Sequence, residues 1–291
     1  MKVLFITPPF HAGVVEVAGR WVPLYFVCLA GAVRKGGHEP YIYDAMTKDT
    51  GFEEIEKKIR EISPDVVATT AISCTSPDAI EVMELAKKIN PEITTVCGGI
   101  HASFMYEEMF GLTGSIDYII VGEGETTIVE LLNALSNGKG TAAVKGLAYK
   151  EGDMVVRTDK RPYIEDLDTV GMAWDCLDWE DYTYFILPGS RLGAIDTSRG
   201  CSQKCTFCSQ QKFWEGTWRA RTPEGIIREL KEQAKCGVDV VLFTDDYPTP
   251  DGPRWERLLD LLIEEDLPMR ILMETRAVDI IRDKDILWKY K

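Results

Sequence analysis

Three cysteines within eight residues give the chain its clearest chemical signal. In the segment C-S-Q-K-C-T-F-C, Cys201, Cys205 and Cys208 are separated by three and two residues. Eight cysteines placed at random in 291 residues would produce this spacing only about 0.005 times, so the group predicts a metal or cluster site. Structural zinc normally takes four Cys or His ligands, and the chain's histidines all lie far upstream. An iron–sulfur cube also takes four ligands, so three cysteines leave one iron open to an exogenous ligand, which indicates reactivity.

The other cysteines and the start of the chain bear on its environment. The segment MKVLFITPPF has no small-residue cleavage site, and the longest apolar stretch, Val22 to Val33, is too short to cross a bilayer. We therefore expect a cytoplasmic protein without a membrane span, whose thiols stay reduced. The remaining cysteines lie singly in or beside apolar runs and are expected to be buried and inert: Cys28, Cys74, Cys97, Cys176 and Cys236.

The charge balance excludes one class of partner. The formal net charge is -14, and no stripe of clustered Lys and Arg is visible. Because binding to phosphate backbones depends on such clusters, we expect no nucleic-acid partner. The acidity is typical of a solvated, soluble surface.

Residues 1–140 are predicted to form a doubly wound, Rossmann-like α/β domain. Short apolar, β-branched runs alternate with longer amphipathic ones, which is the pattern of a parallel sheet covered by helices. The predicted strands are Val3–Ile6, Pro40–Tyr43, Val66–Ala71, Thr94–Cys97 and Tyr118–Val121. The predicted helices are Leu24–Lys35, Phe52–Ile62, Pro77–Ile89 and Thr127–Leu135.

The rest of the chain is predicted to hold a connector and a second α/β domain. Residues 141–190 comprise a hairpin around Glu151 and Gly152 followed by an acidic, aromatic connector. Residues 191–291 contain a second βα series that corresponds to the first half of a βα barrel. Its predicted strands are Leu192–Thr197, Val238–Thr244 and Arg270–Glu274, and its predicted helices are Pro223–Lys235, Pro253–Glu265 and a last one from Asp283.

With the aromatic Phe207 before its last cysteine, the cysteine motif resembles the signature of the radical S-adenosylmethionine (SAM) enzymes. The resemblance implies a 4Fe-4S cluster whose open iron is chelated by SAM, and hydrogen abstraction by a 5'-deoxyadenosyl radical. It also implies SAM contacts at two later strand ends, through Asp245 and Asp246 and through Glu274 and Arg276. The family's usual Gly-Gly-Glu is not present at the first of these ends. The residues alone leave strand-end capping open for the Asp pair and a surface ion pair open for Arg276.

The loops after the strands of the first domain resemble those of the cobalamin-binding domain that precedes many radical SAM barrels. Parallel sheets bind ligands at the carboxyl ends of their strands, and glycine pairs there let backbone approach a flat macrocycle. The resemblance implies a cobalamin site made by Asp44, Met46, Ser73, Thr75, Gly98, Gly99, Gly122 and Glu123. Where base-off cobalamin proteins have Asp-x-His-x-x-Gly, this chain has Met46 in place of the histidine, so we expect no lower-face histidine ligand. His101 is an alternative functional residue, although a lone loop histidine is as often structural.

Several stretches together look like the anaerobic magnesium-protoporphyrin IX monomethyl ester oxidative cyclases, a group within this family. These stretches are Tyr43–Thr47, Gly99–Tyr106 and Cys208–Trp214. The resemblance implies an oxidoreductase of bacteriochlorophyll biosynthesis that acts on a small-molecule tetrapyrrole, takes its oxygen from water and draws electrons from a donor such as flavodoxin or ferredoxin. Two alternatives stay open: a cobalamin-dependent radical SAM methyltransferase, and a non-catalytic cobalamin or cluster sensor. Since a radical SAM barrel needs about six βα units and only three can be counted, we also expect the chain to be a fragment that turns over poorly.

Overall fold

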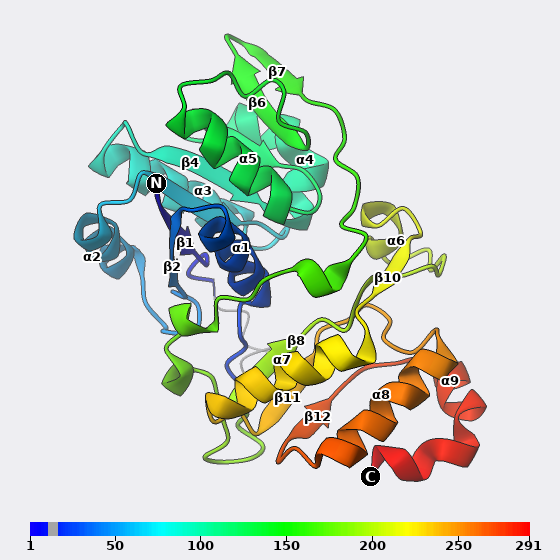
Figure 1. Cartoon of the computed structure of the whole chain (residues 1–291). Helices are drawn as coiled ribbons and strands as arrows, with labels where there is room; N and C mark the ends of the chain where they lie inside the picture. Colours follow the sequence, from blue (N-terminus) through cyan, green and yellow to red (C-terminus); the bar gives the residue numbers. More distant parts are fainter. Residues whose placement is uncertain (11–16) are drawn as a thin grey trace. The chain divides into compact units, whose positions relative to one another are not determined.

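The computed structural model describes residues 1–10 and 17–291, which divide into two compact units (Figure 1). The described part of the first unit consists of residues 1–10, 25–164 and 170–177. The described part of the second consists of residues 17–24, 165–169 and 178–291. The boundaries expected at residues 140 and 190 stay predictions, and each unit is described by itself.

The first unit is built on a seven-stranded sheet in the order β2-β1-β3-β4-β5-β6-β7. The first five strands are parallel, and the hairpin β6–β7 adds to the edge in antiparallel fashion. The strands are β1 (Lys2–Ile6), β2 (Glu39–Tyr43), β3 (Val66–Thr70), β4 (Thr94–Gly98), β5 (Tyr118–Ile120), β6 (Leu147–Glu151) and β7 (Met154–Arg157). The helices are α1 (Leu24–Lys35), α2 (Phe52–Ile62), α3 (Ser76–Ile89), α4 (Gly99–Leu112) and α5 (Glu125–Ser136).

The two faces of this sheet carry separate apolar cores, as β1 illustrates. Successive side chains of a strand point to opposite faces. Leu4 and Ile6 accordingly pack in the core made with α2, α3 and α4, whereas Val3 and Phe5 pack in the core made with α1 and α5. Helices therefore cover both faces, and the predicted doubly wound fold is confirmed.

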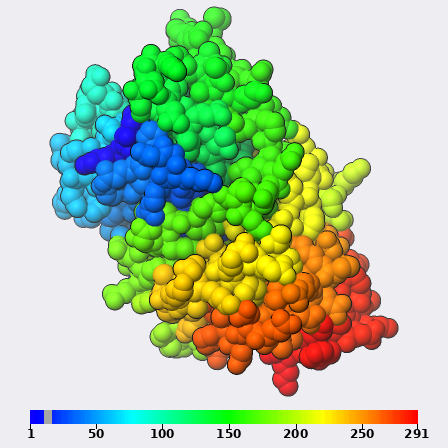
Figure 2. Space-filling model, in the orientation of Figure 1, coloured from blue at the N-terminus to red at the C-terminus, as the bar shows by residue number. Residues whose placement is uncertain are grey.

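The second unit contains a parallel sheet in the order β12-β11-β8, and helices lie between these strands along the chain. Its strands are β8 (Leu192–Ile195), β11 (Val240–Phe243) and β12 (Arg270–Leu272). Its helices are α6 (Gln210–Phe213), α7 (Pro223–Lys235), α8 (Gly252–Glu265) and α9 (Ala277–Arg282). Ile195, Phe243 and Trp255 are nearly fully buried in the core between this sheet and α7 and α8. Figure 2 shows α7 and α8 in yellow and orange on the surface of this unit.

Two details of the second unit differ from the sequence prediction. The predicted strand Leu192–Thr197 ends at Ile195, and the chain then turns into an antiparallel hairpin of β9 (Ser198–Gly200) and β10 (Trp218–Ala220), which was not predicted. The predicted last helix from Asp283 is present as a 3-10 helix, whereas the short α-helix before it was not predicted. Helix α9 ends at Arg282, and a 3-10 helix follows from Lys284 to Tyr290. Paired arginine and carboxylate groups at Arg282, Asp279 and Asp283 stabilise this junction.

No helix in the described part of the chain is long and apolar enough to cross a bilayer.

Candidate functional site

Asp44 follows β2 at the carboxyl edge of the first sheet, and its carboxylate accepts hydrogen bonds from nearby protein groups. Its side chain is 3% exposed. Oδ1 accepts hydrogen bonds from the Thr7 hydroxyl at 2.7 Å and from the Thr47 backbone N–H at 3.1 Å. The Met46 backbone N–H donates to the same Thr7 hydroxyl. Asp44 thus holds the turn that carries Met46, which is itself half-buried.

The glycine pair after β4 combines one constrained position with one open position. Gly99 has φ +92°, and a Cβ there would lie 2.5 Å from Thr70 Oγ1 and 2.7 Å from the Ala71 carbonyl oxygen. A Cβ on Gly98 would meet nothing within 4 Å. Gly122, after β5, has φ +89° and open space at the same position. Backbone at Gly98 and Gly122 is therefore accessible to a flat ligand, which fits a corrin ring or its nucleotide tail.

The loop after β3 contains one polar residue that is buried in a turn, Thr75, and one that is exposed, Ser73. Thr75 is buried, and its hydroxyl accepts from the Ile72 backbone N–H at 3.0 Å, just before α3. Ser73 is exposed, and its hydroxyl lies 3.3 Å from His101 Nδ1. Ile72 beside it is 49% exposed, so the loop offers an apolar surface next to polar groups.

Glu123 lies at the same edge, but its carboxylate is engaged by the connector. The side chain is buried, and Oε2 accepts from the Ile164 backbone N–H at 2.8 Å. Glu123 therefore fixes the chain after the β6–β7 hairpin.

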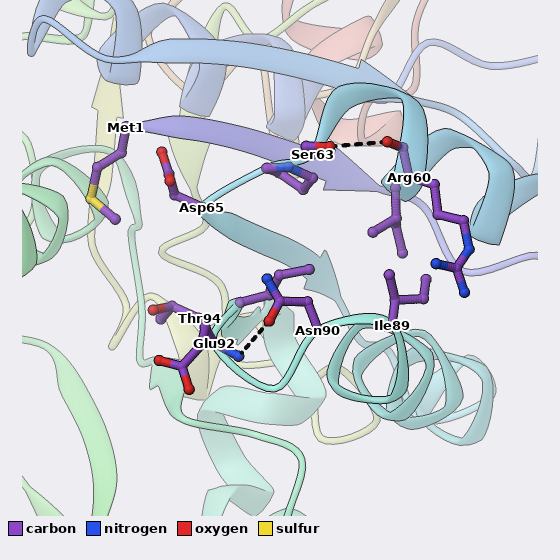
Figure 3. Close-up of a pocket in the computed structure, with 11 residues that line it drawn as sticks. Met1, Arg60, Ser63, Asp65, Ile89, Asn90, Glu92 and Thr94 are labelled. Atoms are coloured by element: carbon purple, nitrogen blue, oxygen red, sulfur yellow. Dashed lines mark hydrogen bonds between the residues drawn. The ribbon is translucent and has the colours of Figure 1, made fainter.

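A separate cavity lies at the opposite, amino edge of the first sheet. Figure 3 shows Met1, Asp65 and Thr94 around it, at the starts of β1, β3 and β4. Its volume is about 480 Å³, and Arg60, Ser63 and Asn90 also line it. None of the residues predicted to bind cobalamin contributes to this cavity.

The three motif cysteines follow β9 in the second unit. All three are free thiols of intermediate exposure. The Cys208 backbone N–H donates to the Cys205 carbonyl at 3.2 Å, and the Gln211 side-chain amide donates to the same carbonyl at 3.0 Å. Among residues 1–10 and 17–291, no three His, Cys, Asp or Glu side chains converge on one metal position. The thiols are thus accessible and unbridged on one short loop, as cluster ligands must be, but the fold by itself does not gather their sulfur atoms.

The other five cysteines divide by exposure. Cys28 and Cys97 are buried as predicted, and burial raises the pKa of the Cys97 thiol to about 12, so this thiol is inert. Cys176 and Cys236 are of intermediate exposure. The prediction is wrong for Cys74, which is exposed because it lies in the surface loop after β3.

The carboxyl end of β11 places Asp245 against the chain that leads to the cysteines. Its Oδ2 accepts from the Thr197 backbone N–H at 3.0 Å. Its Oδ1 accepts from the hydroxyls of Thr197 and Ser198, at 2.7 and 2.5 Å. Burial raises the pKa of Asp245 to about 6, even though the hydrogen bonds from Thr197 and Ser198 oppose that shift.

Asp246 contacts the chain on both sides of the motif. Its Oδ2 accepts from Trp214 Nε1 at 2.7 Å, and its carboxyl group is also hydrogen-bonded to the Gly200 backbone. Burial raises its pKa. The Arg219 guanidinium lies 5.3 Å from the centre of the Trp214 indole, in cation–π geometry.

The remaining residues predicted to contact SAM are at the surface of the second unit. The Phe207 side chain is 91% exposed, and Glu274 and Arg276 after β12 are also exposed. The Arg276 guanidinium lies 5.7 Å from the centre of the Tyr247 ring. The structure therefore brings Asp245 and Asp246 together with residues that flank the motif.

Sequence reasoning did not identify Thr197 and Ser198 as parts of this site, and it noted Trp214 only as the end of the stretch that resembles the cyclases. Two adjacent hydroxyl residues before the first cysteine and an indole after the last were the available signals. Such residues are common in cores and turns, so only their partners reveal their role.

Comparison with known protein families defines the class of the chain. Residues 10–132 match the B12 binding domain, and residues 195–291 match the Radical SAM superfamily. The chain belongs to the radical SAM superfamily, within the group whose radical SAM domain follows a B12 binding domain. The predicted resemblance is confirmed, as are the predicted cofactor classes of the two domains: cobalamin for the first, and a 4Fe-4S cluster with SAM for the second.

The relatives include a cyclase and a methyltransferase. The chain is 38% identical to the anaerobic magnesium-protoporphyrin IX monomethyl ester cyclase of Rubrivivax gelatinosus, over 99% of this chain and 52% of that protein. It is 34% identical to an uncharacterized methyltransferase of Pyrococcus horikoshii, over 87% of this chain and 55% of that protein. The chain thus spans about half the length of these curated relatives.

A solved structure has the same fold. The cobalamin-dependent SAM radical enzyme OxsB, with aqua-cobalamin and SAM bound, superposes with a TM-score of 0.79. The match covers 97% of this chain and 40% of that chain, at 20% identity. At this identity the likeness concerns the fold alone.

Proposed function

We propose that this chain carries the cofactor-binding part of an anaerobic oxidative cyclase that acts on magnesium-protoporphyrin IX monomethyl ester or a closely similar tetrapyrrole. The observation that carries the proposal is the 38% identity to a cyclase of that name across 99% of the chain. The presence of both domain types in one chain supports it, because this chemistry would draw on both cofactors. Loss of hydrogen from a propionate side chain and formation of the fifth ring make the reaction an oxidation.

The proposed cluster ligands are Cys201, Cys205 and Cys208. Three thiolates leave one iron of a 4Fe-4S cluster open, and the amino and carboxylate groups of SAM would chelate it. When bound, the cluster supplies the electron that cleaves SAM reductively. An electron donor such as flavodoxin or ferredoxin is proposed as the source of that electron.

The proposed SAM contacts come from three places in the second unit. Phe207 offers an exposed aromatic face for the adenine, and Arg276 offers a planar fork that suits a carboxylate. Glu274 stands on the same loop for the ribose hydroxyls. We propose Asp246, rather than Asp245, for the SAM ammonium group, since both oxygens of Asp245 already accept hydrogen bonds from Thr197 and Ser198.

The proposed cobalamin site lies at the carboxyl edge of the first sheet. Gly98 and Gly122 provide backbone without a covering side chain, and Gly99, with its positive φ, lets the chain pass directly from β4 into α4. Met46, Ser73 and Thr75 lie on neighbouring loops, held by Asp44 and by the turn before α3. Glu123 supports the site indirectly by anchoring Ile164.

A cobalamin-dependent methyltransferase is the second proposed function, and the 34% identity to a methyltransferase favours it. Both activities use the same two cofactors, so the fold does not distinguish them. A non-catalytic cobalamin or cluster sensor is the alternative from another class, and it would bind the cofactors without consuming SAM.

One experiment separates the three. The chain, reconstituted with iron, sulfide and cobalamin, is incubated anaerobically with magnesium-protoporphyrin IX monomethyl ester, SAM and a reductant, and the products are identified by mass spectrometry. A product that has gained oxygen from labelled water and a fifth ring supports the cyclase. A product heavier by one methyl group supports the methyltransferase. Cofactor binding without 5'-deoxyadenosine or methylated product supports the sensor and contradicts the proposal.

A further inference from the structure

Thr197 lies four positions before the first motif cysteine, and each of its polar atoms makes a hydrogen bond within the fold. It is fully buried, and its N–H and hydroxyl both donate to Asp245. Its carbonyl accepts from Arg254 Nη2 at 2.6 Å and from the Arg221 backbone N–H at 2.9 Å. A residue with all of its hydrogen-bonding groups paired inside the fold is held in a single orientation.

The same carboxylate holds the next residue. Ser198 is buried and begins β9, the strand that runs directly into Cys201. Its hydroxyl donates to Asp245 Oδ1 at 2.5 Å. Asp245 therefore accepts three hydrogen bonds from the two residues that turn the chain from β8 toward the cysteines. Hydrogen bonds to an ionised acceptor are about twice as strong as neutral ones, so this turn is firmly held.

Residues 201–213, which we term the cluster loop, are also held at both ends by Asp246. Gly200 precedes the loop and Trp214 follows it, and both are hydrogen-bonded to the Asp246 carboxylate. Both residues that flank the cluster loop are thus hydrogen-bonded to one carboxylate, just after the end of β11. This arrangement limits how far its cysteines can move relative to β11.

A buried, ionised Asp245 lowers the stability of the folded state, so stabilisation alone does not explain why a carboxylate stands here. Burial raises its pKa to about 6, so burial penalises the charge that it carries at neutral pH. Partly buried carboxylates with perturbed pKa values gather at functional sites. Both oxygens of Asp245 are occupied by Thr197 and Ser198, so Asp245 supports the chain before the cysteines instead of offering a ligand.

We propose that Asp245 is a positioning residue for the cluster: it fixes Thr197 and Ser198 so that the cluster loop begins at a fixed place, from which its three thiolates can close around one cluster. The inference rests on the proposed radical SAM function and adds to it a residue that touches neither the cluster nor SAM. The two adjacent aspartates then have different roles: Asp246 is proposed to bind the SAM ammonium group, and Asp245 to hold Thr197 and Ser198 in place.

The test compares Asp245→Asn with a matched control at the other end of the same strands. Asp239 precedes β11, is similarly half-buried, and accepts from the Arg191 backbone N–H at 2.8 Å across to the start of β8. Asp239→Asn therefore makes the same change from carboxylate to amide far along the strand from the cysteines, and its amide oxygen can still accept from Arg191, whereas Asp245→Asn loses one of two oxygens that both accept hydrogen bonds. Both variants and the parent chain are reconstituted anaerobically and compared in iron and sulfide content, in the paramagnetic resonance spectrum of the reduced cluster with and without SAM, and in the rate of SAM cleavage.

The expected result is a shifted or broadened cluster spectrum in Asp245→Asn and a loss of at least ten-fold in kcat for SAM cleavage, with KM little changed. Asp239→Asn should keep the parent spectrum and rate. Ser198→Ala, which removes one of the three bonds, should show a smaller shift in the same direction, and it serves as the readout if Asp245→Asn does not fold. A parent-like spectrum and rate in Asp245→Asn or in Ser198→Ala, or equal changes in Asp239→Asn, would overturn the positioning role alone. A parent chain that assembles no cluster would overturn the proposed function together with it.

Discussion

Gly98 and Gly99 are adjacent glycines for which the structure predicts opposite consequences of the same substitution. At Gly99 an added Cβ would lie 2.5 Å from Thr70 Oγ1, 2.7 Å from the Ala71 carbonyl oxygen and 2.9 Å from the Ala71 nitrogen, at φ +92°. At Gly98 it would meet nothing within 4 Å, and the backbone is extended, with φ -140°. Gly99→Ala is therefore expected to damage the fold, whereas Gly98→Ala should act mainly on the ligand.

The sizes of the two effects follow from these contacts. A non-glycine residue in a left-handed conformation costs about 1–2 kcal/mol, and forcing a side chain into packed surroundings costs about 1–3 kcal/mol more. Gly99→Ala should thus lower the free energy of unfolding by about 2–5 kcal/mol, or the melting temperature by about 5–15 °C for a unit of this size. Gly98 caps α4, where alanine is a poorer cap than glycine, so Gly98→Ala should cost only about 0.5–1 kcal/mol.

Two measurements check this reasoning. Thermal unfolding without cobalamin should show the large loss for Gly99→Ala and the small loss for Gly98→Ala. Titration with cobalamin, followed by its absorbance, should show weaker binding in Gly98→Ala at a temperature where this variant is fully folded, because its methyl group projects into the space open to the ligand. Equal stability of the two variants would refute the strain argument, and unchanged cobalamin affinity in Gly98→Ala would refute the location of the site.

Three further predictions concern the cofactors and the charge at β11. Cys201→Ala, Cys205→Ala and Cys208→Ala should each lose the cluster, measured as iron and sulfide content, whereas Cys236→Ala should retain it; normal content in any one of the three would contradict the ligand set. Bound cobalamin should have no histidine on its lower face, so the cob(II)alamin spectrum should lack nitrogen superhyperfine splitting, and splitting that disappears in His101→Ala would show that the site is misplaced. Because burial raises the pKa of Asp245 from its ordinary value of 3.8 to about 6, its contribution to stability is largest below about pH 4 and is lost as the pH rises through 6. Asp245→Asn should therefore flatten this part of the curve of melting temperature against pH, with Asp196 and Arg254 as the other charged groups that interact with it; parallel curves would contradict the assignment.

Much of this protein follows from its sequence, because the signals are local and periodic. β-branched runs separated by amphipathic segments predict the parallel sheet of the first unit, and β1 to β5 form within a few residues of their predicted positions. The spacing of the three cysteines predicts a metal or cluster site, since such sites need thiolate ligands whatever the surrounding fold. The paired glycines point to the carboxyl edge of the sheet, where the cobalamin site is proposed, because all parallel strands end there.

Only the tertiary structure decides which of two neighbouring residues does what. Asp245 and Asp246 are indistinguishable in the sequence, yet successive residues after a strand point in different directions, and one meets Thr197 and Ser198 while the other meets Trp214. The hairpin β9–β10 was likewise missed, because its pairing joins residues about twenty positions apart through strands of three residues, too short to show a period. Gly98 and Gly99 differ for the same reason. The atoms that crowd Gly99 belong to Thr70 and Ala71, at the end of β3, and the local sequence around the two glycines does not show how close these distant residues lie.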